Sequence, residues 1–292
     1  MAFLTEEINT ATFTTTGVPP ATFDLVTKKF GTSSIVFDDT ATSTWWGSGN
    51  PVTLNAPTGT NLVGLTNFTI SFWVNPTEAS SGNDLYVGQH KTDQWPSWYL
   101  RKYDNKVWFV AGTSGFLFTS SGYLSTNNWN HIAVVKSGNV YKLFINGITR
   151  HTVTKSDADY TGTMGYFSIG AGRDHGFTYH NFDGYIDEFW IKNTAEWSTD
   201  FSVPTAPITT PGAEVLFLAH FDEPQFSIFG NASEDCRVLV IDETTWEVEN
   251  SEVVSAGNYE ISVAEGSKTV VAVPDDTGKN NITYRSVTPV TL

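Results

Sequence analysis

Short segments in which apolar and polar residues alternate run from Phe30 to Phe229, and turn-forming Gly, Asn, Asp and Pro separate them. Alternation with a period of two is typical of strands that bury one face, and the stretch has no helical periodicity of useful length. The clearest predicted strands are 34–38, 68–74, 98–102, 106–110, 131–135 and 141–145. The pattern therefore predicts an all-β fold, in which the main part is a large antiparallel jelly-roll sandwich.

The segment 68–74 shows how the faces are assigned. Phe68, Ile70 and Phe72 share one face of the predicted strand, and Trp73 lies on the other. We expect the first face to pack in the core and Trp73 to mark the opposite face as a contact surface. Further along, Asn146-Gly147 is a strong signal for a two-residue hairpin turn, because both residues tolerate positive φ.

The amino-acid composition of the chain changes after Pro224. Before this point a Pro-rich stretch, 204–211, is followed by one more apolar strand at 215–221. Beyond it aromatic residues are fewer, and acidic residues outnumber basic ones. Four further predicted strands, 236–241, 257–263, 268–274 and 282–287, suggest a small second sandwich. We predict an N-terminal arm at 1–21, which could also form an edge strand, a jelly roll at 22–225 and a small β-sandwich at 226–292.

Composition and charge narrow the function classes. The 20 Phe, 11 Tyr and 10 Trp suit pleated strands, and a net charge of −15 without a basic cluster argues against nucleic acid or an anionic membrane as partner. Cys236 is the only cysteine, so no intramolecular disulfide framework is possible. We expect no export signal at the N-terminus, where Glu6 and Glu7 replace an apolar stretch, and no membrane span.

Five motifs, in this order and spacing, resemble the laminin G-like jelly roll of the concanavalin A-like superfamily over about residues 22–222: segments 30–38, 68–74, 129–134, 143–147 and 182–189. The extension formed by 200–207 and 215–222 resembles the segments that succeed such domains in structural proteins of tailed bacteriophages, especially marine ones. Segments 257–261 and 271–276 are similar to transthyretin-like carboxypeptidase regulatory modules.

This resemblance implies a non-enzymatic virion surface protein, either a capsid decoration protein or a tail or fibre component, that displays a lectin-like domain. Its expected partners are other virion proteins, with a homotrimer expected because trimers are usual in these classes. Release by lysis would explain an adhesive fold that has neither an export signal nor disulfides. The alternatives are a carbohydrate-binding module that attaches to host or environmental glycans and, less favoured, a glycan hydrolase.

The hydrolase alternative depends on one strand. Laminarinase-type members of the superfamily carry Glu-x-Asp-x-x-Glu there, which places two carboxylates on one face for a retaining mechanism. Here Tyr185 and Trp190 stand where the glutamates should be, and only Asp187 is shared. The sequence therefore predicts no enzyme and no catalytic residue.

Acids and histidines supply the candidate metal ligands. Laminin G-like domains often hold Ca²⁺ at the rim of the sandwich through carboxylates and carbonyls. The candidate Ca²⁺ ligands, all at predicted strand ends, are Asp38, Asp39, Asp183 and Asp222, although a turn-forming role is the commoner explanation for each of these Asp residues. His175 and His180 flank a Gly-rich loop but lack a convincing third ligand for Zn²⁺.

Carbohydrate recognition needs exposed aromatic faces beside planar hydrogen-bonding groups. Two clusters supply these residue types, and the predicted glycan-binding residues are Trp95, Trp98, Tyr99 and Arg101 in one and Arg173, Asp174, His175 and Tyr179 in the other. The same aromatic residues are also candidates for the core or for a protein interface, since so many Trp in one sandwich cannot all face a ligand.

Overall fold

A computed structural model of the protein describes residues 14–15, 21–37, 52–55, 60–62, 64–77, 83–91, 96–103, 106–111, 116–119, 124–155, 164–172, 180–222, 226–232, 236–242, 248–254, 257–263, 268–274, 283–287 and 290–291. The chain divides into two compact units, one formed by Leu4–Asp222 and the other mainly by Glu223–Leu292. Across the described ranges, no helix has the length and apolar character that a membrane span requires.

The larger unit contains strands β1 to β17. Their bounds are β1 Thr14–Thr15, β2 Thr22–Asp24, β3 Ser34–Phe37, β4 Val52–Asn55, β5 Asn67–Pro76, β6 Asn83–Lys91, β7 Pro96–Tyr103, β8 Lys106–Ala111, β9 Phe116–Thr119, β10 Asn130–Ser137, β11 Val140–Ile145, β12 Ile148–Thr154, β13 Met164–Ile169, β14 Ala171–Gly172, β15 His180–Asn181, β16 Gly184–Lys192 and β17 Val215–Ala219.

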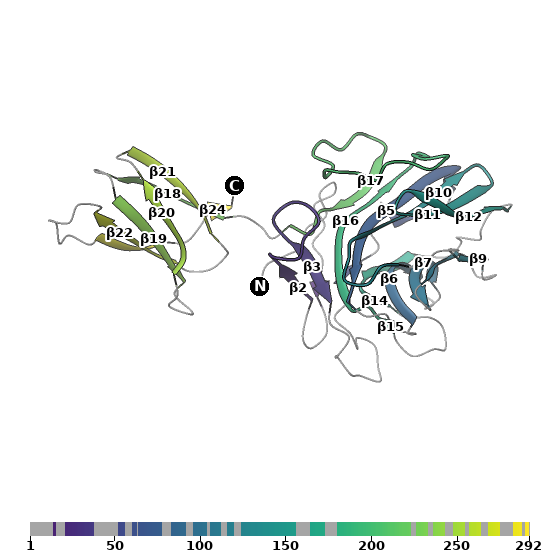
Figure 1. Ribbon diagram of the computed structural model, residues 1–292, viewed down its shortest axis with the longest axis horizontal. Coiled ribbons are helices and arrows are strands. Elements are labelled where there is room, and N and C mark those ends of the chain that lie inside the picture. The colour runs from purple at the N-terminus through teal and green to yellow at the C-terminus, as the bar shows by residue number, and fades with distance from the viewer. Residues whose placement is uncertain are drawn as a thin grey trace. The chain divides into compact units, whose positions relative to one another are not determined.

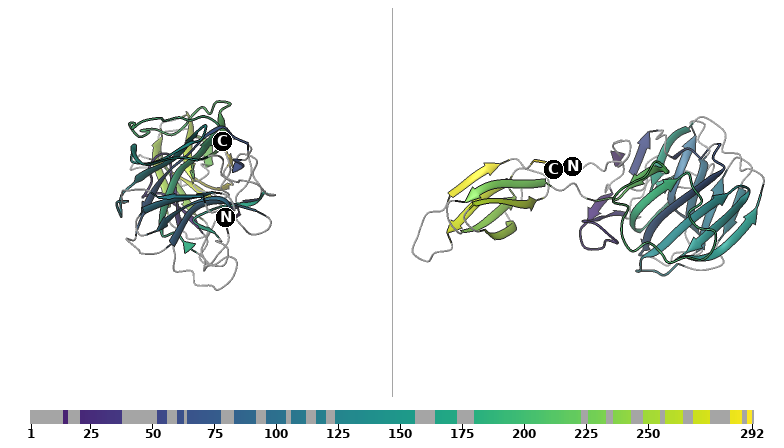
Figure 2. Two further views of the ribbon diagram at one scale, coloured as in Figure 1. Left: turned by 90° about the vertical axis from the view of Figure 1, so that its right-hand side faces the viewer. Right: turned by 90° about the horizontal axis from the view of Figure 1, so that it is seen from above.

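Two antiparallel sheets face each other in this unit (Figures 1 and 2). The seven-stranded sheet has the order β1-β4-β13-β6-β7-β8-β9, and the eight-stranded sheet has the order β12-β11-β10-β5-β16-β3-β2 with β17 beside β16. Strands β14 and β15 form a separate pair. The jelly-roll sandwich predicted from the sequence is confirmed.

The core between the sheets is largely aromatic. Phe72 of β5 lies 5.8 Å from Tyr86 and 5.9 Å from Phe189, measured between ring centroids. Phe167 of β13 lies 5.3 Å from Phe217 of β17, so rings from both sheets interlock. All five side chains are almost completely buried. Burial of each contributes about 2 kcal/mol from the hydrophobic effect, and tilted and edge-to-face contacts add to this.

The faces assigned to the segment 68–74 are correct. Phe68, Ile70 and Phe72 belong to the main core, and Trp73 does not. Trp73 is nevertheless buried, as are Thr69 and Ser71 beside it, because the segment after β16 runs across this outer face. The Asn146-Gly147 turn also forms as predicted, with φ of 53° and 75°.

The smaller unit contains β18 Phe226–Ala232, β19 Cys236–Asp242, β20 Val248–Val254, β21 Gly257–Val263, β22 Lys268–Pro274, β23 Thr283–Val287 and β24 Val290–Thr291. These form a three-stranded sheet, β21-β18-β24, and a four-stranded sheet, β20-β19-β22-β23. The two sheets agree with the small sandwich expected there, and its likeness to transthyretin-like modules stays a prediction.

Candidate functional site

Strands β7 and β8 of the seven-stranded sheet position a group of aromatic residues around one arginine. Along β7, Trp98 and Leu100 point into the core, so Tyr99, Arg101 and Tyr103, which alternate with them, point outward. Tyr99 packs against Val110 of β8 in a cluster separate from the core. The register pairs Arg101 with Trp108, which brings both onto the same outer face.

Arg101 is the centre of this group. Its guanidinium carbon lies 5.7 Å from the ring centroid of Tyr99, 5.8 Å from that of Tyr103 and 5.4 Å from that of Trp108. Tyr103 and Trp108 meet edge to face at 5.6 Å. Tyr103 is the most accessible of the three rings at 42% exposed, whereas Tyr99 is 6% exposed and contacts the guanidinium but offers little surface to a ligand. We call Tyr99, Arg101, Tyr103 and Trp108 the Arg101 cluster.

The Arg101 cluster includes two of the predicted glycan-binding residues and excludes a third. Trp98 is completely buried, and its indole N–H donates to the carbonyl oxygen of Thr60 at 3.0 Å. Its assignment as a glycan contact is therefore wrong, because a ring in the core cannot stack on a sugar. Tyr103 and Trp108 were missed, although the alternation that separates Tyr99 from Trp98 also places Tyr103 outward.

The other predicted glycan-binding residues cannot be placed. Trp95, Arg173, Asp174, His175 and Tyr179 lie outside the described residues. Their role in glycan binding stays a prediction.

The predicted Ca²⁺ ligands do not form a site within the described part of the chain. Asp38 and Asp39 lie outside it. Asp183 immediately precedes β16, and its backbone carbonyl accepts a hydrogen bond from the N–H of Thr77 at 3.2 Å. Among the described residues, no group of three or more His, Cys, Asp or Glu is arranged to hold a metal.

The fourth predicted Ca²⁺ ligand, Asp222, tethers a loop. Its Oδ1 accepts hydrogen bonds from the N–H of Thr32 at 2.5 Å, the hydroxyl of Thr32 at 3.0 Å and the N–H of Ser33 at 3.2 Å. A carboxylate oxygen that faces three donors does not suit a cation, because the donors present partial positive charge to it. Asp222 therefore joins the end of the larger unit to the segment before β3.

Strand β16 carries a bulge at the position where a glucanase would need its carboxylates. The register with β5 shifts between Asp187 and Trp190, and Glu188 has a positive φ of 51°. Bulges re-aim side chains and frequently occur near functional sites. Here the bulge directs both Asp187 and Glu188 away from the core, where strict alternation would have sent one of them inward.

Asp187 serves as a clamp for the loop that precedes β3. Its Oδ2 accepts hydrogen bonds from the N–H groups of Lys29 at 2.8 Å and Phe30 at 3.1 Å, and its Oδ1 accepts one from the N–H of Glu188 at 2.8 Å. Burial raises the pKa of Asp187 to about 8; the N–H groups of Lys29 and Phe30 act in the opposite direction, and nearby carboxylates add to the rise. These contacts support a structural role for the side chain.

The sequence of the larger unit matches a known protein family. The family described as the concanavalin A-like lectin/glucanases superfamily, laminin G type, matches residues 47–197, which is more than half of the sequence. The chain belongs to this superfamily. Because the superfamily includes both lectins and glucanases, membership alone does not choose between binding and hydrolysis. A search of curated proteins found no match.

Solved structures are similar to this chain at low sequence identity. Domain 4 of the extracellular arabinanase AbnA from Geobacillus stearothermophilus is 19% identical, with 64% of this chain and 85% of that chain covered and a TM-score of 0.47. The tailspike protein 2 enzymatically active domain of bacteriophage CBA120 is 10% identical, with 72% and 33% covered and a TM-score of 0.50. A mutant of HCR D/C VPI 5995 is 11% identical, with 97% and 73% covered and a TM-score of 0.51. This chain thus spans only a third of the tailspike chain. The likenesses to the tailspike domain and to HCR D/C VPI 5995 support the fold alone.

Proposed function

We propose that this protein is a non-enzymatic glycan-binding module and that the Arg101 cluster is its contact surface. One observation carries the proposal. Three aromatic side chains on the outer face of β7 and β8 have their ring centroids within 6 Å of the Arg101 guanidinium carbon. Aromatic faces stack on the apolar C–H face of a sugar, and a guanidinium donates to its hydroxyls in a fixed plane. Contacts with Tyr99, Tyr103 and Trp108 fix the direction of these donors before a ligand arrives.

Membership of a superfamily of lectins and glucanases supports a carbohydrate ligand. Two observations favour binding over hydrolysis. The strand that would carry the catalytic glutamates offers Tyr185 and Trp190 instead. Asp187 is the one acid of the glucanase motif that this strand keeps, and both of its carboxylate oxygens accept hydrogen bonds from backbone N–H groups.

We further propose that the module is displayed on the surface of a virion, as a capsid decoration protein or a tail or fibre component. The support is the resemblance of segments 200–207 and 215–222 to the extensions found in phage structural proteins. Mass spectrometry of purified particles tests this setting, and particles that lack the chain would contradict it. A homotrimer in contact with other virion proteins stays part of the same proposal.

A glycan array with the full chain tests the binding function. We expect specific glycans to bind, and Tyr103→Ala to weaken that binding by about tenfold, because one stacking contact and one cation–π contact are lost. Ile148→Ala is the matched control, since Ile148 is also an exposed apolar side chain, 43% accessible, but lies on β12 of the other sheet. A blank array, or equal binding by both variants, would remove the proposal for this surface.

A further inference from the structure

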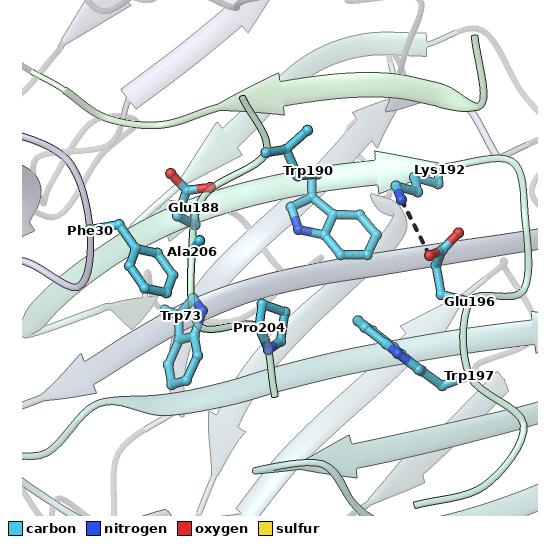
Figure 3. Close-up of a pocket in the computed structure, with 10 residues that line it drawn as sticks. Phe30, Trp73, Glu188, Trp190, Lys192, Glu196, Trp197, Pro204 and Ala206 are labelled. Carbon is cyan, nitrogen blue, oxygen red and sulfur yellow. Dashed lines mark ion pairs between the residues drawn. The ribbon is translucent and has the colours of Figure 1, made fainter. Parts of the chain in front are cut away.

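A small cavity lies on the outer face of the eight-stranded sheet. The Arg101 cluster lies on the other sheet, the seven-stranded one. It has a volume of about 160 Å³, and its walls are mainly Trp73, Trp190, Trp197, Phe30, Pro204 and Ile208. Figure 3 shows that Trp190 comes from a strand, whereas Trp197 and Pro204 come from the segment that crosses the sheet. The cavity is therefore a product of tertiary structure.

The crossing segment, residues 193–212, is held firmly on the sheet. The hydroxyl of Thr69 donates to the carbonyl of Thr194 at 2.7 Å and accepts from the N–H of Glu196 at 3.0 Å. Trp197 stacks on Phe201 with 3.8 Å between parallel ring centroids, and the N–H of Phe201 donates to Gly147 at 2.9 Å. The wall that this segment provides is preformed, which lowers the entropic cost of binding.

The bulge in β16 adds a carboxylate to this aromatic cavity. Glu188 lines the cavity, its side chain is 5% exposed, and its Oε1 lies 2.6 Å from Nδ1 of His220. A carboxylate this deeply buried is costly unless it has partners, so its place beside the rings is held by the fold.

The charges around the cavity are balanced. Lys192 pairs with Glu196 at 3.2 Å, and its ammonium lies 5.1 Å from the ring centroid of Trp190. The ammonium of Lys29 lies 3.8 Å from the ring centroid of Trp73. The protein's own lysines thus already lie over one face of two of the indoles, and Lys192 also accompanies Glu196. Because charges of both signs line the cavity, a neutral ligand that both donates and accepts hydrogen bonds suits it best.

Size and chemistry together select the ligand. A cavity of about 150 Å³ accommodates benzene, so this cavity has room for no more than a single ring. A neutral pyranose ring has an apolar C–H face for the indoles and hydroxyls that both donate to carboxylates and accept from an ammonium. We propose that this cavity, which we call the Glu188 pocket, binds a single neutral sugar ring, such as the end of a glycan chain.

This proposal goes beyond glycan binding by the Arg101 cluster, because it adds a second site on the other sheet. Two sites on the outer faces of opposite sheets would let one domain contact two glycan segments at once and so gain avidity. Neither site depends on the other, and their tests are separate.

The experiment uses the tryptophans of the pocket as reporters. Methyl pyranosides of glucose, galactose, mannose and N-acetylglucosamine are titrated into the full chain, and the intrinsic fluorescence is followed. We expect saturable, weak binding of at least one pyranoside, with affinity reduced about tenfold or more in Glu188→Gln because a hydrogen bond to a charged group is lost.

Ala206→Trp tests the location. Ala206 is an exposed residue that lines the cavity, so a bulky side chain there should close the mouth without disturbing the core. Ala213→Trp is the matched control, because Ala213 is exposed just beyond the same segment and does not line the cavity. We expect Ala206→Trp to abolish the signal, and Ala213→Trp and Tyr103→Ala to retain it, with unchanged circular dichroism in all three.

Three results would overturn the proposal. They are no saturable response to any pyranoside, a response that survives Ala206→Trp, and preferential binding of tetramethylammonium or benzyl alcohol over every sugar. Loss of glycan-array binding in Tyr103→Ala with retained pyranoside binding would separate the two sites, so failure of one proposal is distinguishable from failure of the other.

Discussion

The Nε2 atom of His131 lies 2.8 Å from the Oγ atom of Ser71, on the buried outer face of the eight-stranded sheet. The imidazole ring lies 5.0 Å from the ring of Trp73 and 5.7 Å from that of Trp197, and its Nδ1 finds no hydrogen-bond partner among the described residues. Burial, together with the charge of Lys29, lowers the pKa of His131 to about 3. A histidine held neutral beneath the crossing segment makes the stability of this layer sensitive to acid.

The first prediction concerns this histidine. Its pKa in the fold is below the unfolded value of about 6.5, so its stabilising contribution is complete above about pH 6.5 and is lost as the pH falls from there toward about 3. We expect His131→Gln to have a lower free energy of unfolding than the wild type at pH 7. At pH 5 this difference in unfolding free energy should be smaller by about 2 kcal/mol. Urea unfolding of both proteins at the two pH values measures the gap, and a gap that does not change with pH would contradict the assignment.

The second prediction concerns Gly31. It has a φ of 56°, and a Cβ there would collide with the Asp222 carboxylate that accepts three hydrogen bonds from Thr32 and Ser33. Gly138 has the same φ with open space around it. We expect Gly138→Ala to cost about 1 kcal/mol of unfolding free energy and Gly31→Ala about 2–4 kcal/mol. Equal losses in chemical denaturation would show that Asp222 is not a tether.

The third prediction concerns a buried ion pair in the seven-stranded sheet. The ammonium of Lys102 lies 2.6 Å from the carboxylate of Asp84, with side chains 1% and 11% exposed. Lys102→Met leaves a buried carboxylate without its counter-charge and should destabilise the protein by about 3–5 kcal/mol. The double variant Asp84→Asn with Lys102→Met should recover part of this loss in thermal or urea unfolding. A double variant no more stable than the single one would contradict this account.

The fourth prediction concerns catalysis. We expect the purified protein to release no reducing sugar from β-glucans. Asp187→Ala should lower the melting temperature, because three backbone N–H groups lose their acceptor. Reducing-sugar release by the wild type that disappears in a folded Asp187→Ala variant would show that the protein is an enzyme.

The sequence by itself determined the strands and the fold class. Alternation placed Phe68, Ile70 and Phe72 on one face, and the Asn146-Gly147 pair marked a turn whose positive φ few other residues accept. These are local properties of a pleated strand, and they survive in any sandwich that buries the apolar face.

Only the tertiary structure decided which of the aromatic residues lie on the outer face of the sheet. Alternation separates Trp98 from Tyr99 but does not say which of the two aromatic rings faces the core, because either could fill it. The packing of the two sheets against each other decided this, and the register of β7 with β8 brought Trp108 beside Arg101.

The Glu188 pocket shows the same limit more strongly. Its walls come from segments near residues 30, 73, 190 and 205, and its carboxylate faces outward because of a register shift at positive φ. A bulge interrupts the period of two on which strand patterns depend, and contacts between distant segments leave no periodic signal in the sequence. Trp73 on the polar face of its strand was the one local sign that this side of the sheet is more than a solvated surface.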